Sequence, residues 1–305
     1  MRAVLITEFG PPSILVVEEI PDPTPGLGEV VIEVAAVSIN FPDIMVVEAA
    51  YQNLPPRLFS PGKESAGRVI AVGDAVDRVT VGQRALTLVE YGGYAEKLVV
   101  PEDLVMALPD GMSYEEAAAC GLVYSTAHFG LLRRAQLKHG ETVLITGAGG
   151  GVGSAGVQLA KAWGARVIAL AQDDAKGDLA RQQGADVVVT SRPETVRDDL
   201  LAATDGRGVD VVLEMLGGEF SEPDHPRQRV GGSDRHCGIR LRRPESNQSQ
   251  PPAGQEHQHH RIAEQRLPRP RRGTDAQHDG RGLRLLRPGQ GQCRDRHHLS
   301  AREGQ

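Results

Sequence analysis

The chain has 305 residues, a length that suits about two domains. Residues 1–217 carry 17 Lys and Arg against 29 Asp and Glu, whereas residues 218–305 carry 17 Arg, no Lys and 11 acidic residues. No segment reaches the length of a membrane span, no signal-peptide pattern is present, and the 3 cysteines have no paired spacing. The sequence therefore argues against a membrane-spanning protein and a disulfide scaffold, and it predicts a cytoplasmic location.

The first 125 residues are predicted to form short strands separated by turns. Segments rich in Val, Ile and Ala, several with period-2 alternation, lie at residues 2–6, 15–18, 29–38, 65–72, 84–88 and 96–100. Turn-forming pairs such as Pro61-Gly62 and Gly92-Gly93 separate them. This pattern predicts a small antiparallel β domain, partly barrel-shaped, over residues 1–125.

From residue 114 the pattern changes to helix and then to a regular alternation of strands and helices. Helical spacing covers residues 114–120 and 125–135. Apolar strands then follow at 142–146, 166–170, 186–190 and 209–215, with helices at 153–163, 176–183 and 194–203 between them. Such strands predict a parallel sheet covered on both faces. This α/β domain over residues 126–217 has four expected strands, whereas a complete doubly wound dinucleotide-binding fold has about six.

A glycine-rich run lies between the first of these strands and its helix: Gly147-Ala148-Gly149-Gly150-Gly151-Val152-Gly153. Glycines let the chain turn tightly and bring backbone amides against a pyrophosphate, next to the positive end of the helix dipole. A strict G-x-G-x-x-G is absent, because Ala148 takes the first glycine position. The flanking strand and helix nevertheless favour a dinucleotide site over a plain turn. The candidate cofactor residues in the run are Gly147, Ala148, Gly150, Gly151, Val152 and Gly153.

The end of the second strand bears on the choice of cofactor. Sites specific for NAD usually place an acidic residue there to bind the ribose 2′-hydroxyl, whereas this chain has Ala171 followed by Gln172. Lys176 is a candidate partner for the 2′-phosphate of NADPH, with a solvated helix lysine as the alternative. Asp173 and Asp174 favour NADH unless they serve as helix N-terminal charges. We therefore expect NADPH, with NADH less favoured, and name Gln172 and Lys176 as candidate cofactor residues.

Several short motifs run continuously through residues 1–217. They are Asn40-Phe41-Pro42-Asp43, Tyr51-Gln52, Pro61-Gly62-Lys63-Glu64-Ser65-Ala66-Gly67, Gly92-Gly93-Tyr94-Ala95-Glu96, the glycine run, Gly184-Ala185-Asp186 and Gly208-Val209-Asp210-Val211-Val212. With them the chain resembles the zinc-free quinone oxidoreductases of the medium-chain dehydrogenase/reductase superfamily. The resemblance implies a GroES-like domain, a Rossmann domain and an active site in the cleft between them. It also implies hydride transfer from NADPH to a quinone or activated alkene, and a homodimer for the intact fold.

The same resemblance suggests catalytic residues and a metal-free site. Zinc-dependent relatives carry a Cys where Asn40 stands and a Gly-His-Glu where Gly62-Lys63-Glu64 stands, so we expect no zinc. Asn40 is expected to orient the nicotinamide carboxamide, and Tyr51 to donate a hydrogen bond to a substrate oxygen or to stack on a flat ring. The alternatives are that Asn40 only ends a strand and that Tyr51 only packs a loop. Cys120 is expected to belong to the core rather than to act as a nucleophile.

The residues after 217 suggest a shifted reading frame. When each codon is read one base later, residues 231–242 permit an apolar strand with glycine turns. Residues 250–261, 283–290 and 295–303 permit further strings in the same register, and all four resemble the C-terminal part of quinone oxidoreductases in order. The rival hypothesis is an Arg-rich nucleic-acid-binding arm, which a net charge of only +6 and the scarcity of aromatic residues disfavour. We expect residues 218–305 to be out of frame and of low order.

This hypothesis has consequences for the chain as written. We expect it to lack the last two sheet strands and the dimer-forming edge, and therefore to fold poorly and be inactive. The expected partner of the restored enzyme is a small-molecule quinone or enone, with no nucleic acid and no membrane. An enoyl-thioester or alcohol reductase of the same superfamily is the alternative activity. A non-catalytic product of a frameshifted gene is the alternative to an enzyme.

Overall fold

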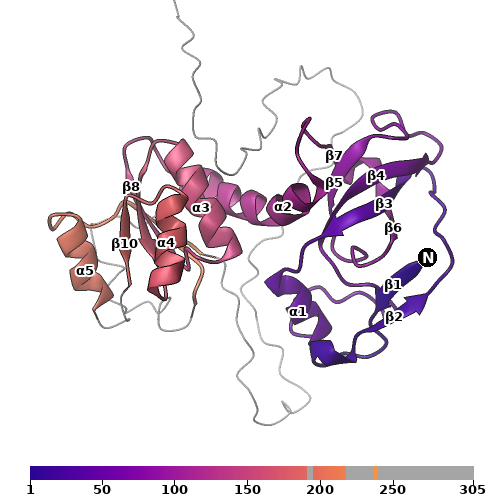
Figure 1. The fold of residues 1–305 in the computed structure, drawn as a ribbon, viewed down its shortest axis with the longest axis horizontal. Coiled ribbons are helices and arrows are strands. Elements are labelled where there is room, and N and C mark those ends of the chain that lie inside the picture. The colour runs from indigo at the N-terminus through magenta and orange to yellow at the C-terminus, as the bar shows by residue number, and fades with distance from the viewer. Residues whose placement is uncertain (191–194, 218–235, 239–305) are drawn as a thin grey trace, which may run out of the picture. The chain divides into compact units, whose positions relative to one another are not determined.

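The computed structural model describes residues 1–190, 195–217 and 236–238. In the N-terminal part, five strands form one antiparallel sheet in the order β6-β3-β4-β5-β7, as the sequence predicted for this region. The strands are β3 (Glu29–Val37), β4 (Glu64–Val72), β5 (Arg84–Leu88), β6 (Lys97–Pro101) and β7 (Val105–Ala107). The adjacent strands β3, β4 and β5 are visible in Figure 1. One face of the sheet buries Val30, Ile32 and Val69 in a common core.

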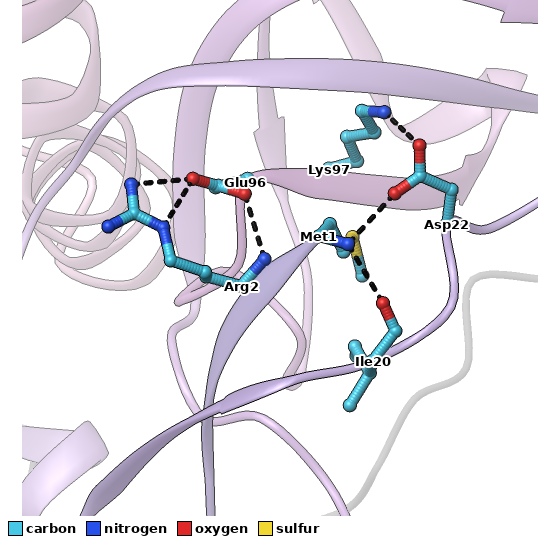
Figure 2. Close-up of polar contacts among 6 residues, drawn as sticks. All are labelled: Met1, Arg2, Ile20, Asp22, Glu96 and Lys97. Carbon is cyan, nitrogen blue, oxygen red and sulfur yellow. Dashed lines mark hydrogen bonds and ion pairs between the residues drawn. The ribbon is translucent and has the colours of Figure 1, made fainter.

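A short hairpin, β1 (Arg2–Leu5) and β2 (Val16–Glu19), lies before this sheet, with a 3₁₀ turn between its strands at Pro12–Ile14. The hairpin is hydrogen-bonded to Glu96, the residue just before β6. The Arg2 backbone N–H donates to Glu96 Oε2 at 2.8 Å, and its Nε donates to Glu96 Oε1 at 2.8 Å (Figure 2). Both side chains are exposed, so the ion pair fixes the position of the hairpin but adds little to the stability of the fold.

A second set of polar contacts joins the segment after β2 to β6. The Met1 ammonium donates to the Ile20 carbonyl at 2.8 Å and pairs with Asp22 Oδ1 at 3.0 Å (Figure 2). The other Asp22 oxygen accepts a hydrogen bond from Lys97, the first residue of β6. The Lys97 hydrogen bond, followed by that from the N-terminus, lowers the pKa of Asp22. These contacts hold the hairpin beside the sheet.

One helix of the N-terminal part was not predicted: α1 (Phe41–Val47), between β3 and β4. Asn40 is its N-cap residue, and Asp43 in the first turn accepts the Asn40 N–H at 2.8 Å. The helix buries Val46 and Val47 against Ile6 and Phe59. A helix of 7 residues is too short to show a helical period in the sequence, which explains the omission.

The next helix, α2 (Tyr114–His128), is longer than predicted. Its first turn is capped by Ser113, whose Oγ accepts the Glu116 N–H at 3.1 Å. The sequence suggested two helices over this stretch, but α2 is continuous to residue 128 and a π-helical turn follows at Phe129–Arg134. Helix α2 crosses the boundary predicted at residue 125 and contacts both β4 and α3 (Gly151–Ala162). It therefore belongs structurally to both parts.

The C-terminal part is a parallel sheet in the order β10-β9-β8-β11-β12. Its strands are β8 (Thr142–Thr146), β9 (Arg166–Leu170), β10 (Val187–Val189), β11 (Val211–Glu214) and β12 (His236–Gly238), and its further helices are α4 (Asp174–Gln182) and α5 (Val196–Ala203). Alternate residues of one strand enter different cores: Val143 and Ile145 belong to one cluster, and Leu144 to another. The predicted sheet with two covered faces is confirmed.

The strand β12 differs from the prediction, which ended this sheet after four strands. Residues 236–238 pair in parallel with β11, so a three-residue fifth strand comes from the Arg-rich tail. They lie inside the 231–242 window in which a shifted reading frame permits a strand. The rest of the tail, and with it the frameshift hypothesis and the predicted low order, lies outside the described residues.

Candidate active site

The glycine run forms the turn between β8 and α3. Gly147 has φ +60°, a conformation that favours glycine. Within the turn, the Gly150 N–H donates to the Gly147 carbonyl at 2.9 Å, and the Ala148 N–H donates to the Leu170 carbonyl at 3.2 Å. These two amides shape the turn and are not directed at a ligand. Ala148 is fully buried in the sheet core, which accounts for an alanine at this point.

The amides open to a phosphate belong to the first turn of α3. Gly150 is the N-cap residue, and the first helical bond of this end runs from the Ser154 N–H to the Gly150 carbonyl at 2.8 Å. The N–H groups of the first residues of a helix have no partner inside it. In α3 these residues are Gly151, Val152 and Gly153, three of the six candidates in the run.

Two glycines of the run permit close approaches that a side chain would block. A Cβ atom on Gly153 would lie 2.1 Å from the Gly147 carbonyl oxygen, so the turn and helix can pack together only with glycine there. A Cβ atom on Gly149 would lie 2.6 Å from Lys176 Cβ, because the Lys176 stem crosses the turn. The run therefore forms a glycine cradle with a lysine beside it, and these residues fit a dinucleotide phosphate.

The beginning of α4 brings the other two candidates together. Lys176 Nζ donates to Gln172 Oε1 at 2.7 Å, which holds the ammonium close to the end of β9. Asp173 is the N-cap residue of α4, where its Oδ1 accepts the Lys176 N–H at 2.8 Å. Asp174 lies in the first helical turn. Both acids thus serve as N-terminal charges of α4. Because they have this structural role, they do not favour NADH as the cofactor.

Asn40 is half-buried and held by hydrogen bonds on its side chain. Its Nδ2 donates to Ser38 Oγ at 2.7 Å and lies 3.2 Å from Glu64 Oε1. Asn40 follows strand β3 and is the N-cap residue of α1. Its backbone therefore has a structural role at the end of the strand, as the alternative to a catalytic role proposed. The side-chain contacts are additional to that role and fix where the amide points.

Tyr51 is also half-buried, and its ring packs beside the cluster formed by Ile6, Val46 and Phe59. Lys63 Nζ lies 4.2 Å from the centroid of this ring. The same ammonium donates to the Glu90 carbonyl at 3.1 Å and to Glu90 Oε2 at 3.0 Å. The Tyr51 ring thus packs a loop, as the alternative expected, and it also carries a cation on one face.

Four polar residues, parts of the sequence motifs but not predicted as site residues, complete this region: Asp43, Lys63, Glu64 and Tyr94. The Tyr94 hydroxyl donates to Asp43 Oδ2 at 2.9 Å. Burial is the main cause that raises the pKa of Asp43, Glu64 and Tyr94. The signal available in the sequence was the pair Lys63-Glu64 entering a strand that is otherwise apolar, because buried charges are rare unless they are paired.

Helix α2 connects the Asn40 region to the glycine turn through two consecutive residues. The Leu122 N–H donates to Glu64 Oε2 at 2.7 Å. Next to it, Val123 lies against the turn, since a Cβ atom on Gly151 would be 3.0 Å from Val123 Cγ1. The β domain and the α/β domain, which were predicted as separate domains, thus both contact the same segment of α2.

Comparisons with known proteins show the family of the chain. A family model described as alcohol dehydrogenase GroES-like domain matches residues 26–110, and one described as zinc-binding dehydrogenase matches residues 151–225. A quinone oxidoreductase-like protein 2 homolog from Nematostella vectensis is 35% identical over 220 residues, which are 72% of this chain and 60% of that protein. The quinone oxidoreductase of Pseudomonas syringae is 34% identical, with a TM-score of 0.67 over 72% of this chain and 68% of the other.

The chain belongs to the medium-chain dehydrogenase/reductase superfamily, among its quinone oxidoreductase-like members. Relatives and structural neighbours of the chain are named quinone oxidoreductases. The Escherichia coli quinone oxidoreductase, solved with NADPH, is 31% identical with a TM-score of 0.67 over 72% of this chain and 67% of that chain. The enoyl reductase CurK is 34% identical, with a TM-score of 0.67 over 72% of this chain and 68% of that chain. The match to the Nematostella relative spans less than two thirds of that protein's length.

The family model that matches residues 151–225 carries zinc in its description. The positions at which zinc-dependent relatives are expected to bind the metal, Asn40 and Lys63, lie outside that match. Asn40 has an amide and Lys63 an ammonium paired with Glu90, and neither is a usual zinc ligand. Over residues 1–190, 195–217 and 236–238, no group of three or more His, Cys, Asp or Glu side chains could hold a metal ion. The residues beside Asn40 thus do not fit a catalytic zinc.

None of the helices in the part of the chain that the structure describes has the length and apolarity of a membrane span.

Proposed function

We propose that this quinone oxidoreductase-like chain has the site of an NADPH-dependent, zinc-independent reductase. Such an enzyme transfers hydride to a quinone or an activated alkene. The observation that carries the proposal is the junction at α2. There Leu122 bonds to Glu64, the partner of Asn40, and Val123 contacts the glycine turn. A nicotinamide nucleotide has its phosphates and its reactive ring at separate ends, so it needs two such groups next to each other.

The phosphate end of the cofactor is assigned to the glycine cradle. The free amides of Gly151, Val152 and Gly153 and the dipole of α3 favour a pyrophosphate. Lys176, which crosses the turn at Gly149, is the group placed to bind a 2′-phosphate. The structure of the related E. coli enzyme with NADPH supports this cofactor, and an NAD-dependent alcohol dehydrogenase among the structural neighbours keeps NADH as the alternative.

The reactive end is assigned to Asn40 and Tyr51. Bound NADPH would supply the hydride. Asn40 would orient the nicotinamide carboxamide, and the Tyr51 hydroxyl would donate a hydrogen bond to the substrate oxygen as negative charge develops on it. Such a donor stabilises the transition state more than the ground state, which is how a site without a Lewis acid accelerates the reaction.

The test is to follow NADPH oxidation by the purified protein from the frame-restored gene with a simple quinone, an enone and an enoyl thioester. We expect turnover of the quinone or enone, unaffected by a chelator, and a kcat reduced about tenfold or more in Asn40→Ala. A preference for the enoyl thioester would instead favour the enoyl-reductase alternative, to which the similarity to CurK points. NADPH binding, read from cofactor emission or from Trp163 fluorescence, separates an inactive chain from one that cannot bind. Absence of binding would contradict the proposal for the chain as written.

A further inference from the structure

Glu64, at the start of β4, is a fully buried carboxylate surrounded by hydrogen-bond donors. Its Oε2 accepts the Leu122 N–H at 2.7 Å. Its Oε1 accepts the Ser38 hydroxyl and lies 3.2 Å from Asn40 Nδ2. Three donors around a buried carboxylate compensate much of the cost of removing it from water. Glu64 has none of the roles assigned to Asn40, Tyr51 or the glycine turn.

The direction of these hydrogen bonds follows from what each group can donate. The Leu122 backbone N–H can only donate, so Glu64 Oε2 must accept. Ser38 gives its single hydroxyl proton to Glu64 Oε1 and therefore accepts, through a lone pair, the Asn40 N–H at 2.7 Å. The chain of bonds thus runs from Asn40 through Ser38 to Glu64. It uses the NH2 side of the Asn40 amide. The capping box of α1 turns Oδ1 towards the Asp43 backbone N–H, and the second lone pair of Oδ1 is left for another partner.

We infer that Glu64 is a positioning residue that sets the orientation of the Asn40 amide, so that Asn40 presents Oδ1 to the carboxamide NH2 of the nicotinamide. The inference rests on the proposed function, since it assigns the partner of Oδ1. The geometry also explains Gly121: a Cβ atom there would lie 2.7 Å from Glu64 Oε2, so only glycine lets the carboxylate approach α2. Anchored on α2 through the Leu122 N–H, the carboxylate acts on the NH2 side of the Asn40 amide, whereas the cofactor would meet Oδ1.

Glu64→Gln is the decisive variant because it keeps the shape and changes one acceptor into a donor. The Leu122 N–H requires the Gln carbonyl, so the Gln NH2 must face Ser38 and Asn40. The 3.2 Å contact between Asn40 Nδ2 and this atom would then set two NH2 groups against each other, which favours an Asn40 amide turned with its Oδ1 inward and its NH2 outward. This reversal would remove the recognition of the carboxamide without removing any side chain from the site.

The measurement compares the dissociation constants of NADP+ and of its 3-acetylpyridine analogue, in which a methyl group replaces the carboxamide NH2. We expect the full chain to prefer NADP+ by about three- to tenfold, the value of one hydrogen bond. The ratio should fall to about one in Glu64→Gln and in Asn40→Ala, and not fall further in the double variant. Glu18→Gln, a change on the exposed strand β2, is the matched control and should keep the original ratio. A preserved ratio in Glu64→Gln, with the ratio lost in Asn40→Ala, would overturn the inference.

A second measurement needs no cofactor and so separates this inference from the proposed function. In the ligand-free protein, the Asn40 side-chain NH2 should give an NMR signal with slowed hydrogen exchange, identified by its loss in Asn40→Asp. The exchange should accelerate in Glu64→Gln and in Ser38→Ala, and remain slow in Glu18→Gln. Rapid exchange in the unmodified protein, or equal exchange in all variants, would overturn the inference. If the NMR result holds but no nucleotide binds, the proposed function fails, and with it the assigned partner of Oδ1.

Discussion

The Lys63 ammonium lies 4.2 Å from the centre of the Tyr51 ring, and the two residues come from different segments of the N-terminal part. The Lys63 side chain is only 6% exposed, and its second partner, Glu90, lies on the solvent side at 62% exposure. A cation that is shielded from water interacts more strongly with an aromatic face than an exposed one does. We interpret Lys63 as the group that fixes the ring of Tyr51, the proposed substrate-binding residue.

This interpretation predicts an energetic coupling between the two side chains. In a double-mutant cycle of Lys63→Met and Tyr51→Leu, the free energies of unfolding should deviate from additivity by about 0.5–2 kcal/mol. Urea denaturation of the four proteins measures the coupling. Tyr114→Leu provides the control, because the ring of Tyr114 faces Arg84 and should be additive with Lys63→Met. Full additivity in both pairs would show that the Lys63 contact is incidental.

Two glycines of the turn should respond differently to the same substitution. Gly153→Ala places Cβ 2.1 Å from a backbone oxygen, so we expect a loss of about 1–3 kcal/mol of stability together with loss of nucleotide binding. Gly149→Ala meets the Lys176 side chain instead, at 2.6 Å, and should mainly displace that lysine. Its NADPH-to-NADH affinity ratio should fall about tenfold, as in Lys176→Ala, with a smaller change in Tm. Unchanged ratios in both variants would exclude Lys176 as the 2′-phosphate ligand.

Cys120 on α2 should be an unreactive thiol at neutral pH. Burial is the main cause that raises its pKa to about 11, and the charges of Glu64 and Glu116 add to the effect. Since the thiolate is the reactive form, the rate with a disulfide reagent should rise about tenfold per pH unit up to the pKa. A Cys237→Ser/Cys293→Ser variant isolates this thiol. Glu64→Gln should accelerate the reaction by removing a negative neighbour. A rate at pH 7 equal to that of the unfolded chain would contradict the prediction.

Glu64 should also make stability depend on pH. Burial raises its pKa in the folded state above the ordinary value of 4.5, so the native state binds this proton more readily than the unfolded state does. The free energy of unfolding contributed by Glu64 is therefore largest below that ordinary value and falls as pH rises through the raised pKa. Asp43, Tyr94 and Cys120 are the titratable groups whose charges interact with it.

The measurement is urea denaturation of the parent chain and Glu64→Gln across a series of pH values. Relative to the variant, the parent should lose stability as pH increases above 4.5. Asp43, whose pKa is raised by burial as well, is present in both proteins, so the comparison retains only the part of its titration that is coupled to Glu64. A constant difference at every pH would mean that Glu64 titrates in the folded state as it does in the unfolded state.

The frameshift hypothesis predicts two proteins of different activity. A gene with its frame restored near codons 219–221 should encode an enzyme that oxidises NADPH with a simple quinone, whereas the chain as written should be inactive. Both should be purified and compared in the same assay. Equal activity would refute the hypothesis, as would nucleotide sequencing that confirms an intact frame over this stretch.

Much of the fold was predictable because it depends on local patterns. The strands of both sheets were located to within a few residues from apolar alternation or apolar runs, except for two strands of three residues each, β7 and β12. Helix α1 and the continuity of α2 through Gly121 were missed. The seven residues of α1 make only about two turns, too few for a helical period to stand out. The glycine in α2 is explained by the close approach of Glu64, Leu86 and Leu88.

The sequence by itself determined the glycine turn, the two-faced sheet and the family, since each depends on residues close together in the chain. Only the tertiary structure decided what surrounds the proposed reactive residues. Glu64 bonds to Leu122 across 58 positions, and Lys63 meets Glu90 across 27, and no periodic pattern records such pairs. The physical reason is that burial makes partners obligatory for charged groups but leaves open which distant residues supply them. The glycine turn indicates where a nucleotide would bind, and the packing of α2 against it brings Glu64 and Asn40 to the same helix.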